Sequence, residues 1–155
     1  MWQKILFICH GNICRSPMAE FVMKHLVALQ GRGADFQIAS AATSREELGS
    51  DIHPGTRRIL VREGIPFSPR RAVQIRPQDY DKWDYLIGMD EENRLGMLRI
   101  FGGDPRQKVH LLLEYAKKDR DIADPWYTGN FDDTYRDIRE GCEALLEHIT
   151  KQAAP

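Results

Sequence analysis

Cysteine is scarce in this chain, and long apolar runs are missing from it. Three cysteines among 155 residues do not make a disulfide framework, and reduced thiols are typical of the cytoplasm, where we expect the protein. No apolar run approaches membrane-spanning length, and the run near the N-terminus is too short for a signal peptide. The sequence therefore predicts no membrane partner.

An excess of charge of either sign is also missing. The 22 lysines and arginines nearly balance the 23 aspartates and glutamates, for a formal net charge of −1. This balance offers neither the basic footprint of a nucleic-acid-binding protein nor a polybasic patch for anionic lipids, so we expect no nucleic-acid partner. A chain of this length makes one ordinary domain with a single core, and we expect that domain to span residues 1–155.

The most informative stretch is Cys9–Pro17, which reads CHGNICRSP. Residues 5–8 before it form a short apolar run that predicts a buried strand. After it, apolar residues recur at helical spacing, namely Met18, Phe21, Val22, Leu26 and Leu29. The pattern predicts a strand, a loop and a helix, with Ser16 capping the helix and Pro17 at its first position.

The residue types of this loop are those of an anion-binding site. Gly11 and Asn12 readily adopt positive φ, so the loop can turn its backbone N–H groups inward around an anion. Arg15 offers a planar guanidinium that can hold two phosphate oxygens at once. Cys9 ends the strand at the bottom of this cup, where the helix N-terminus and Arg15 favour its thiolate form. A thiolate beneath an oxyanion site is suited to phosphoryl transfer to cysteine.

Three other interpretations of the loop are weaker. A lone strand cysteine is commonly a small buried hydrophobe. Cys9, His10 and Cys14 could supply half of a zinc site, but no second pair of cysteine or histidine residues follows at a usable spacing. A nucleotide-binding loop would end in Gly-Lys-Ser/Thr, which the sequence does not contain. The pattern Cys-x5-Arg-Ser between strand and helix therefore favours a phosphatase-type loop that needs no metal and no cofactor.

The rest of the chain alternates between the two periodicities. We expect strands at 36–41, 84–89 and 109–113, and either a short strand or an extended linker at 72–75. We expect helices from Pro54 through Val61, from Asp90 to about Ile100, and from Phe131 or Asp132 onward. Such alternation predicts an α/β fold with a doubly wound parallel sheet, whose ligands bind at the carboxyl ends of the strands.

The segment Cys9–Pro17, together with Asp124-Pro125-Trp126-Tyr127 downstream, resembles the low-molecular-weight protein tyrosine phosphatase family, and the likeness covers essentially the whole chain. The resemblance implies a four-stranded parallel sheet with helices on both faces. It also implies hydrolysis of phosphotyrosine in proteins or peptides through a phosphocysteine intermediate, with inorganic phosphate as the product.

The resemblance also assigns roles to individual residues. It implies that Cys9 is the nucleophile, Arg15 the phosphate ligand and Asp124 the general acid, although an Asp-Pro pair taken alone is more commonly a turn. Ser16 corresponds to a hydroxyl that bonds the cysteine sulfur. The implied substrate-binding residues are His10, Gly11, Asn12, Ile13, Cys14, Ser16, Trp126 and Tyr127.

Two positions depart from the family pattern. Glu46 stands where the family often has an aromatic residue against the substrate ring, and an arginine near Arg70 replaces a histidine that bonds the loop asparagine. A protein arginine phosphatase is the alternative on the same scaffold, although the resembling subfamily has threonine where Ile13 stands.

Two further alternatives are weaker. Arsenate reductases need a further pair of cysteines, whereas only Cys142 remains outside the loop. A non-catalytic phosphopeptide-binding module would need neither Cys9 nor Asp124.

Overall fold

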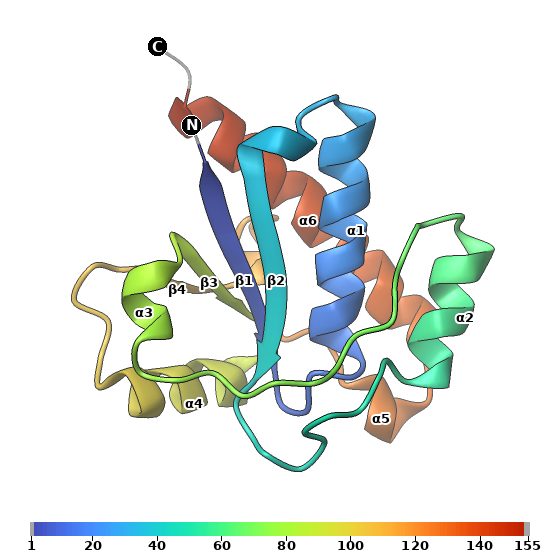
Figure 1. Cartoon of the computed structure of the whole chain (residues 1–155), viewed down its shortest axis with the longest axis horizontal. Helices are drawn as coiled ribbons and strands as arrows, with labels where there is room; N and C mark the ends of the chain where they lie inside the picture. Colours follow the sequence, from blue (N-terminus) through green and yellow to red (C-terminus); the bar gives the residue numbers. More distant parts are fainter. Residues whose placement is uncertain (1, 154–155) are drawn as a thin grey trace.

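In the computed structural model, which describes residues 2–153, four parallel strands form one sheet (Figure 1). The strands are β1 (Gln3–Cys9), β2 (Phe36–Ala42), β3 (Tyr85–Gly88) and β4 (Val109–Leu111), and their order in the sheet is β2-β1-β3-β4. Cys9, the last residue of β1, pairs with Ala42, the last residue of β2. The chain therefore leaves β1 and its neighbour β2 at the same, carboxyl-terminal edge of the sheet.

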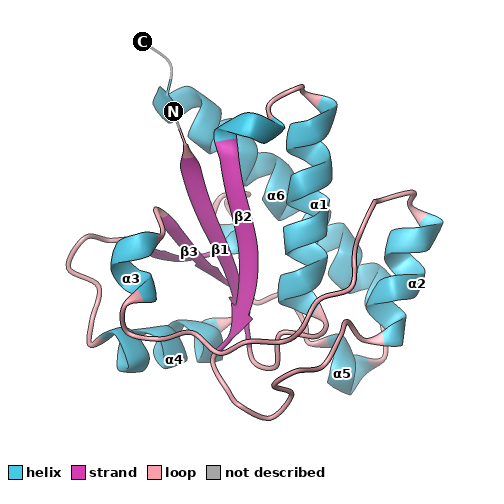
Figure 2. Cartoon of the chain, in the orientation of Figure 1, coloured by secondary structure: helices cyan, strands magenta, loops and turns pink. Residues whose placement is uncertain are grey.

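Helices cover both faces of this sheet (Figure 2). The helices are α1 (Arg15–Leu29), α2 (Pro54–Arg62), α3 (Asp79–Lys82), α4 (Glu91–Phe101), α5 (Pro125–Thr128) and α6 (Phe131–Ala153). Two 3-10 turns, η1 (Gly33–Asp35) and η2 (Leu112–Glu114), complete the described elements. The predicted doubly wound fold is confirmed.

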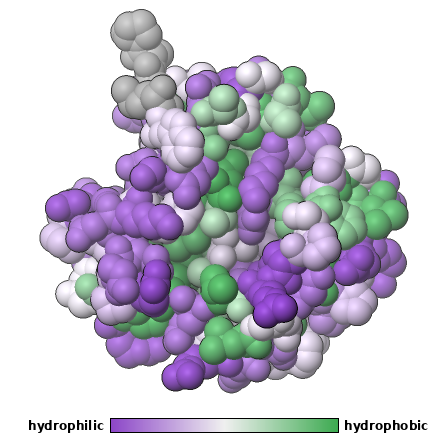
Figure 3. All heavy atoms as spheres, in the orientation of Figure 1, coloured by the Kyte–Doolittle hydropathy of each residue, from purple (hydrophilic) through white to green (hydrophobic). Residues whose placement is uncertain are grey.

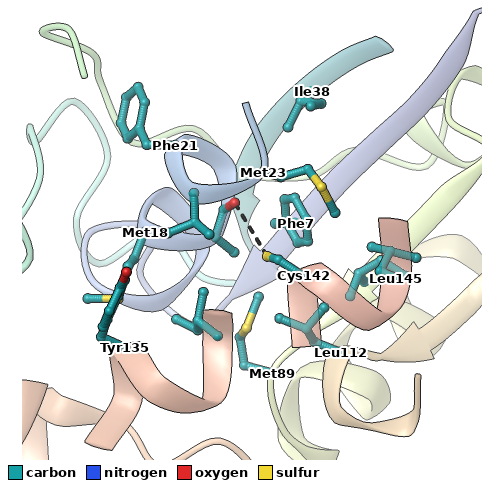
Figure 4. Close-up of a cluster of buried hydrophobic side chains, with 14 of the residues drawn as sticks. Phe7, Met18, Phe21, Met23, Ile38, Met89, Leu112, Tyr135, Cys142 and Leu145 are labelled. Atoms are coloured by element: carbon teal, nitrogen blue, oxygen red, sulfur yellow. Dashed lines mark hydrogen bonds between the residues drawn. The ribbon is translucent and has the colours of Figure 1, made fainter. Parts of the chain in front are cut away.

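Alternate residues of β1 face opposite layers. Ile5 and Phe7 belong to a core cluster with α1, α2 and α6, part of which Figure 4 shows, with Phe7 close to Met23 and Cys142. Leu6 and Ile8 belong to a second cluster with residues of α3 and α4. Because β1 is buried on both faces, it reads as a continuous apolar run, as strands of parallel sheets do.

The helix predicted from Phe131 or Asp132 onward is confirmed as α6. The apolar residues at helical spacing along it are buried, namely Tyr135, Ile138, Cys142, Leu145, Leu146 and Ile149. On the face drawn in Figure 3, hydrophilic residues surround several separate hydrophobic patches. None of the helices in residues 2–153 is long and apolar enough to cross a membrane.

Some predicted element boundaries were wrong. The strand expected at 109–113 ends at Leu111, because the Glu114 carboxylate accepts a hydrogen bond from the Leu111 N–H at 2.9 Å and the chain turns into η2. The strand expected at 84–89 spans only Tyr85–Gly88. Residues 72–75 are an extended linker that makes a single isolated bridge, between Gln74 and Ala42.

Candidate active site

The loop after β1 lines a pocket of about 90 Å³ at the carboxyl edge of the sheet. The pocket brings together residues of the cysteine loop, the segment after β2 and helix α5, and it is lined by Cys9, His10, Gly11, Ile13, Cys14, Arg15, Glu46, Glu47, Asp124, Trp126 and Tyr127. Of the residues predicted for the site, Asn12 and Ser16 support the lining from beneath.

The sulfur of Cys9 is held by Ser16. The Sγ atom lies 3.0 Å from Ser16 Oγ and accepts a hydrogen bond from the Ser16 backbone N–H at 3.4 Å. The prediction that Ser16 caps the helix was wrong, because α1 already begins at Arg15 and the Ser16 hydroxyl turns back toward the sulfur. Pro17 is accordingly the third helical residue and not the first.

Asn12 locks the curled loop. It is fully buried and adopts φ 60°, as predicted, whereas Gly11 does not have positive φ. Its side-chain amide donates to Ser16 Oγ at 2.8 Å and to Ser40 Oγ at 2.9 Å. Ser16 also contacts Cys9. The hydrogen bond from Asn12 therefore positions the Ser16 hydroxyl against the Cys9 sulfur.

An arginine supports Asn12 from outside the loop. Arg70 Nη2 donates to the Asn12 carbonyl at 2.5 Å, and Arg70 Nη1 donates to the Ser50 carbonyl at 3.2 Å. Burial lowers the pKa of Arg70 from its ordinary value, while the negative charges of Glu20, Asp51 and Cys9 act in the opposite direction. The arginine expected to replace the family histidine is therefore Arg70. Its guanidinium donates to the backbone carbonyl of Asn12 and not to the Asn12 side chain.

Arg15 is buried, and its guanidinium is held by three acceptors. Its Nη1 donates to Asp90 Oδ2 at 2.7 Å and to the Ile122 carbonyl at 2.9 Å, and its Nη2 lies 3.4 Å from Asp124 Oδ2. Burial opposes the charge, but the negative charges at Cys9, Asp90 and Asp124 together raise the pKa of Arg15 above its ordinary value. The guanidinium is thus a fixed cation between the cysteine loop and Asp124.

Asp124 lies at the start of α5 and combines two roles. Its Oδ1 accepts a hydrogen bond from the Trp126 N–H at 3.0 Å, which caps the short helix, and its Oδ2 faces Arg15. The side chains of Trp126 and Tyr127 line the pocket, although Trp126 is 56% and Tyr127 82% exposed. The carboxylate of Asp124 therefore caps α5 with one oxygen and faces the Arg15 guanidinium with the other.

Comparison with known proteins agrees with this geometry. The sequence model of the family described as Low molecular weight phosphotyrosine protein phosphatase matches residues 4–154. This chain belongs to that family. Members of the family are cysteine-dependent phosphatases, and the cysteine loop described above is the feature that carried the resemblance.

Several relatives of this phosphatase cover almost its whole length. It is 42% identical over 151 residues to the low molecular weight protein-tyrosine-phosphatase YfkJ of Bacillus subtilis, covering 96% of each chain. The crystal structure of YfkJ matches it with a TM-score of 0.96 at 39% identity, over 99% of this chain and 98% of that one. The crystal structure titled drosophila arginine phosphatase matches with a TM-score of 0.87 at 31% identity, over 95% and 98% of the two chains.

Two polar side chains meet at the rim of the phosphatase pocket. His10 Nε2 lies within hydrogen-bond distance of Glu46 Oε2, at 2.9 Å, and Glu46 occupies the place where the family often has an aromatic residue. Cys14 is buried beside the loop, where burial and the nearby charge of Cys9 raise its pKa to about 12. Among the described residues, no cluster of three or more His, Cys, Asp or Glu side chains could hold a metal ion.

Among the residues that sequence reasoning missed are two that contact the phosphatase site from outside the pocket lining. It placed Asp90 only at the start of an expected helix, but the carboxylate that caps this helix also holds Arg15. It assigned no role to His53, whose ring contacts Trp126. Neither residue belongs to a local motif with the cysteine loop, so only the folded chain brings them to the site.

Proposed function

We propose that this protein is a protein tyrosine phosphatase that removes phosphate from phosphotyrosine through a phosphocysteine intermediate. In this proposal Cys9 is the nucleophile, Arg15 binds the phosphoryl group and Asp124 is the general acid. The observation that supports it most is the meeting of these three side chains in one pocket, with the Arg15 guanidinium placed between the other two.

In the first step, the Cys9 thiolate attacks phosphorus, and the new S–P bond forms as the bond from phosphorus to the tyrosyl oxygen breaks. Asp124 gives its proton to the departing oxygen, which leaves as a neutral phenol. The tyrosyl phenolate is a poor leaving group, because the pKa of its conjugate acid is near 10. A positioned carboxylic acid should contribute about 10²–10⁴ in rate.

In the second step, the Asp124 carboxylate accepts a proton from water, and the water oxygen bonds to phosphorus. The S–P bond breaks, its electron pair returns to Cys9, and inorganic phosphate is the product. The Ser16 hydroxyl and backbone N–H, at 3.0 and 3.4 Å from the sulfur, stabilise the departing thiolate by hydrogen bonds. Arg15 compensates the negative charge of the phosphoryl group throughout both steps.

The proposal includes the setting in which this chemistry operates. The substrates are tyrosine-phosphorylated proteins or peptides, and the reaction uses no metal ion and no cofactor. Residues 1–155 act as one phosphatase domain. The three cysteines are free thiols, which supports action in the cytoplasm.

The proposal is tested by replacing the sulfur. Cys9→Ser should abolish hydrolysis of phosphotyrosyl peptides and of p-nitrophenyl phosphate, while calorimetry still detects binding of vanadate or phosphate. Cys142→Ser is the matched control, because Cys142 is buried in α6 and does not line the pocket, so its activity should be retained. Appreciable turnover by Cys9→Ser, or loss of wild-type activity in EDTA, would overturn the mechanism.

A second candidate function is hydrolysis of phosphoarginine. Two carboxylates, Glu46 and Glu47, line the pocket and could pair with a guanidinium. A similar solved structure is titled an arginine phosphatase. Ile13, which also lines the pocket, supports the tyrosine function instead, because an aliphatic side chain suits a phenyl ring.

A further inference from the structure

His53 contacts the site without lining the pocket. Its backbone N–H donates a hydrogen bond to the Ile13 carbonyl at 2.9 Å. Ile13 belongs to the cysteine loop, so this bond ties the segment before α2 directly to the loop. In Figure 1, α5 lies beside the first turn of α2, which begins immediately after His53.

The imidazole ring of His53 is held on two sides. Its Nδ1 accepts a hydrogen bond from the Gly55 N–H at 2.9 Å and thereby caps α2, which places the proton of the neutral ring on Nε2. The ring also stacks on Phe131, with centroids 5.1 Å apart and planes at 24°. A Cβ atom on residue 55 would lie 2.4 Å from Phe131 Cζ, so the glycine is what lets Phe131 pack this closely.

Trp126 packs edge-on against this fixed ring. The two ring centroids lie 5.8 Å apart with planes at 81°, a favourable arrangement for aromatic pairs. The indole lines the pocket and is more than half exposed, while its backbone N–H bonds the carboxylate of Asp124. The indole therefore gains one of its packing contacts from His53, on a different element from its own.

We propose that His53 is a positioning residue that holds the Trp126 wall in place and so sets the affinity of the pocket for aryl groups. The proposal rests on the phosphatase function proposed above. It adds a second link between the cysteine loop and α5. Arg15 joins them inside the pocket through charge, and His53 joins them at the rim through its backbone and its ring.

The physical reason is preorganisation. An unsupported indole must be ordered when an aryl substrate binds, whereas an indole already packed against His53 has lost that freedom before binding. Loss of the ring should therefore raise KM for phenyl phosphate by roughly threefold to tenfold. Inorganic phosphate has no ring to contact the wall, so its inhibition constant should not change.

Two substitutions separate the capping of α2 by His53 from its packing against Trp126. His53→Asn keeps a side-chain acceptor for the Gly55 N–H but removes the ring, so we expect a melting temperature close to that of the wild type together with the raised KM. His53→Phe keeps a ring but removes the acceptor, so we expect a lower melting temperature with a wild-type KM. The reverse pattern, or an equal rise in KM and in the phosphate inhibition constant for both variants, would overturn the proposal.

A spectroscopic measurement tests the contact without turnover. In protein labelled with 5-fluorotryptophan, the ¹⁹F resonance of Trp126 is assigned by its loss in Trp126→Phe. His53→Asn should move this resonance toward the position of solvent-exposed tryptophan, while Trp2 and Trp83 stay unchanged and His53→Phe retains the shift. An unmoved resonance in His53→Asn would overturn the proposal. If Cys9→Ser were to retain activity, the phosphatase mechanism would fail while this measurement would still decide the role of His53.

Discussion

Asp90 and Arg15 form a largely buried ion pair, with Asp90 Oδ2 accepting from Arg15 Nη1 at 2.7 Å. The side chains are only 2% exposed for Arg15 and 15% for Asp90. The other oxygen of Asp90 accepts a hydrogen bond from the Asn93 N–H at 2.8 Å, which caps α4. The Asp90 carboxylate therefore caps α4 with one oxygen and orients the Arg15 guanidinium with the other.

Replacing Asp90 should separate these two effects. Asp90→Asn keeps a good helix cap but removes the charge that compensates buried Arg15. We expect kcat/KM for aryl phosphates to fall by roughly 10- to 100-fold, since a hydrogen bond to a charged group contributes about 1.5–3 kcal/mol. Asp90→Ala should show the same kinetic loss and a further loss of about 1 kcal/mol in the free energy of unfolding. Steady-state kinetics and urea unfolding measure both; a wild-type kcat/KM in Asp90→Asn contradicts the prediction.

Removing Asp124 should matter most for poor leaving groups. We expect Asp124→Ala to lose about 10²–10⁴ in kcat/KM, which reports the first step only, with phenyl phosphate and much less with p-nitrophenyl phosphate, whose leaving group needs no proton. Asp124→Asn is the matched control, because it keeps the cap on the Trp126 N–H but cannot donate a carboxylic proton. It should lose as much with phenyl phosphate as the alanine variant. Equal losses on both substrates would make Asp124 a structural residue.

The part of the site that residue types alone predicted lies within one short stretch of sequence, whereas Asp124, Trp126 and Tyr127 were implied only by the family resemblance. Cys9 and Arg15 belong to one loop, and its residue types indicate an anion-binding site. Their proximity could therefore be predicted without knowledge of the tertiary structure. Asp90, by contrast, is 75 residues from Arg15, and its contact with the guanidinium depends on the packing of β3 beside β1. His53 likewise reaches Trp126 only because the chain just before α2 folds against α5.

The errors in the fold also have physical causes. Leu112 and Leu113 continue the apolar run of β4, but they are buried in the core next to α6 and not by strand pairing, which an apolar run cannot distinguish. The one-turn helices α3 and α5 are too short to carry a helical period. Ser16 has the preferred residue type for a helix cap, but its hydroxyl contacts Cys9.

The three cysteines should differ in their reaction with iodoacetamide. Burial raises the pKa of Cys14 to about 12, and burial also raises the pKa of Cys142, so both are protonated thiols at pH 7. We expect one adduct at pH 7, on Cys9, and its protection by inorganic phosphate. The Cys14 thiolate forms only as the pH approaches this raised pKa, so labelling of Cys14 should begin well above pH 9. Mass spectrometry of tryptic peptides identifies the sites, and comparable labelling of Cys14 at pH 7 would contradict the prediction.

The selectivity of the pocket should depend on Ile13 and Glu46, which line it together. Ile13 offers apolar contact to a phenyl ring, at roughly 25 cal/mol per Å² buried. It gives no acceptor to a guanidinium, whose desolvated N–H groups would cost about 1–3 kcal/mol. The carboxylate of Glu46 acts in the opposite sense, but its side chain is 70% exposed and already bonded to His10, so its attraction for a guanidinium is screened by water.

We therefore expect the wild type to prefer phosphotyrosine over phosphoarginine peptides by at least about tenfold in kcat/KM, which corresponds to roughly 1.4 kcal/mol. Ile13→Thr should narrow this ratio, mainly by improving phosphoarginine, because the hydroxyl supplies an acceptor and opens space. Glu46→Gln preserves the shape of the side chain and removes its charge, so it should leave the phosphotyrosine rate nearly unchanged. Both peptides with the same flanking sequence would be compared in one phosphate-release assay. If the wild type hydrolyses them equally and Glu46→Gln selectively loses phosphoarginine, the exposed carboxylate outweighs the aliphatic contact and the assignment of selectivity to Ile13 is wrong.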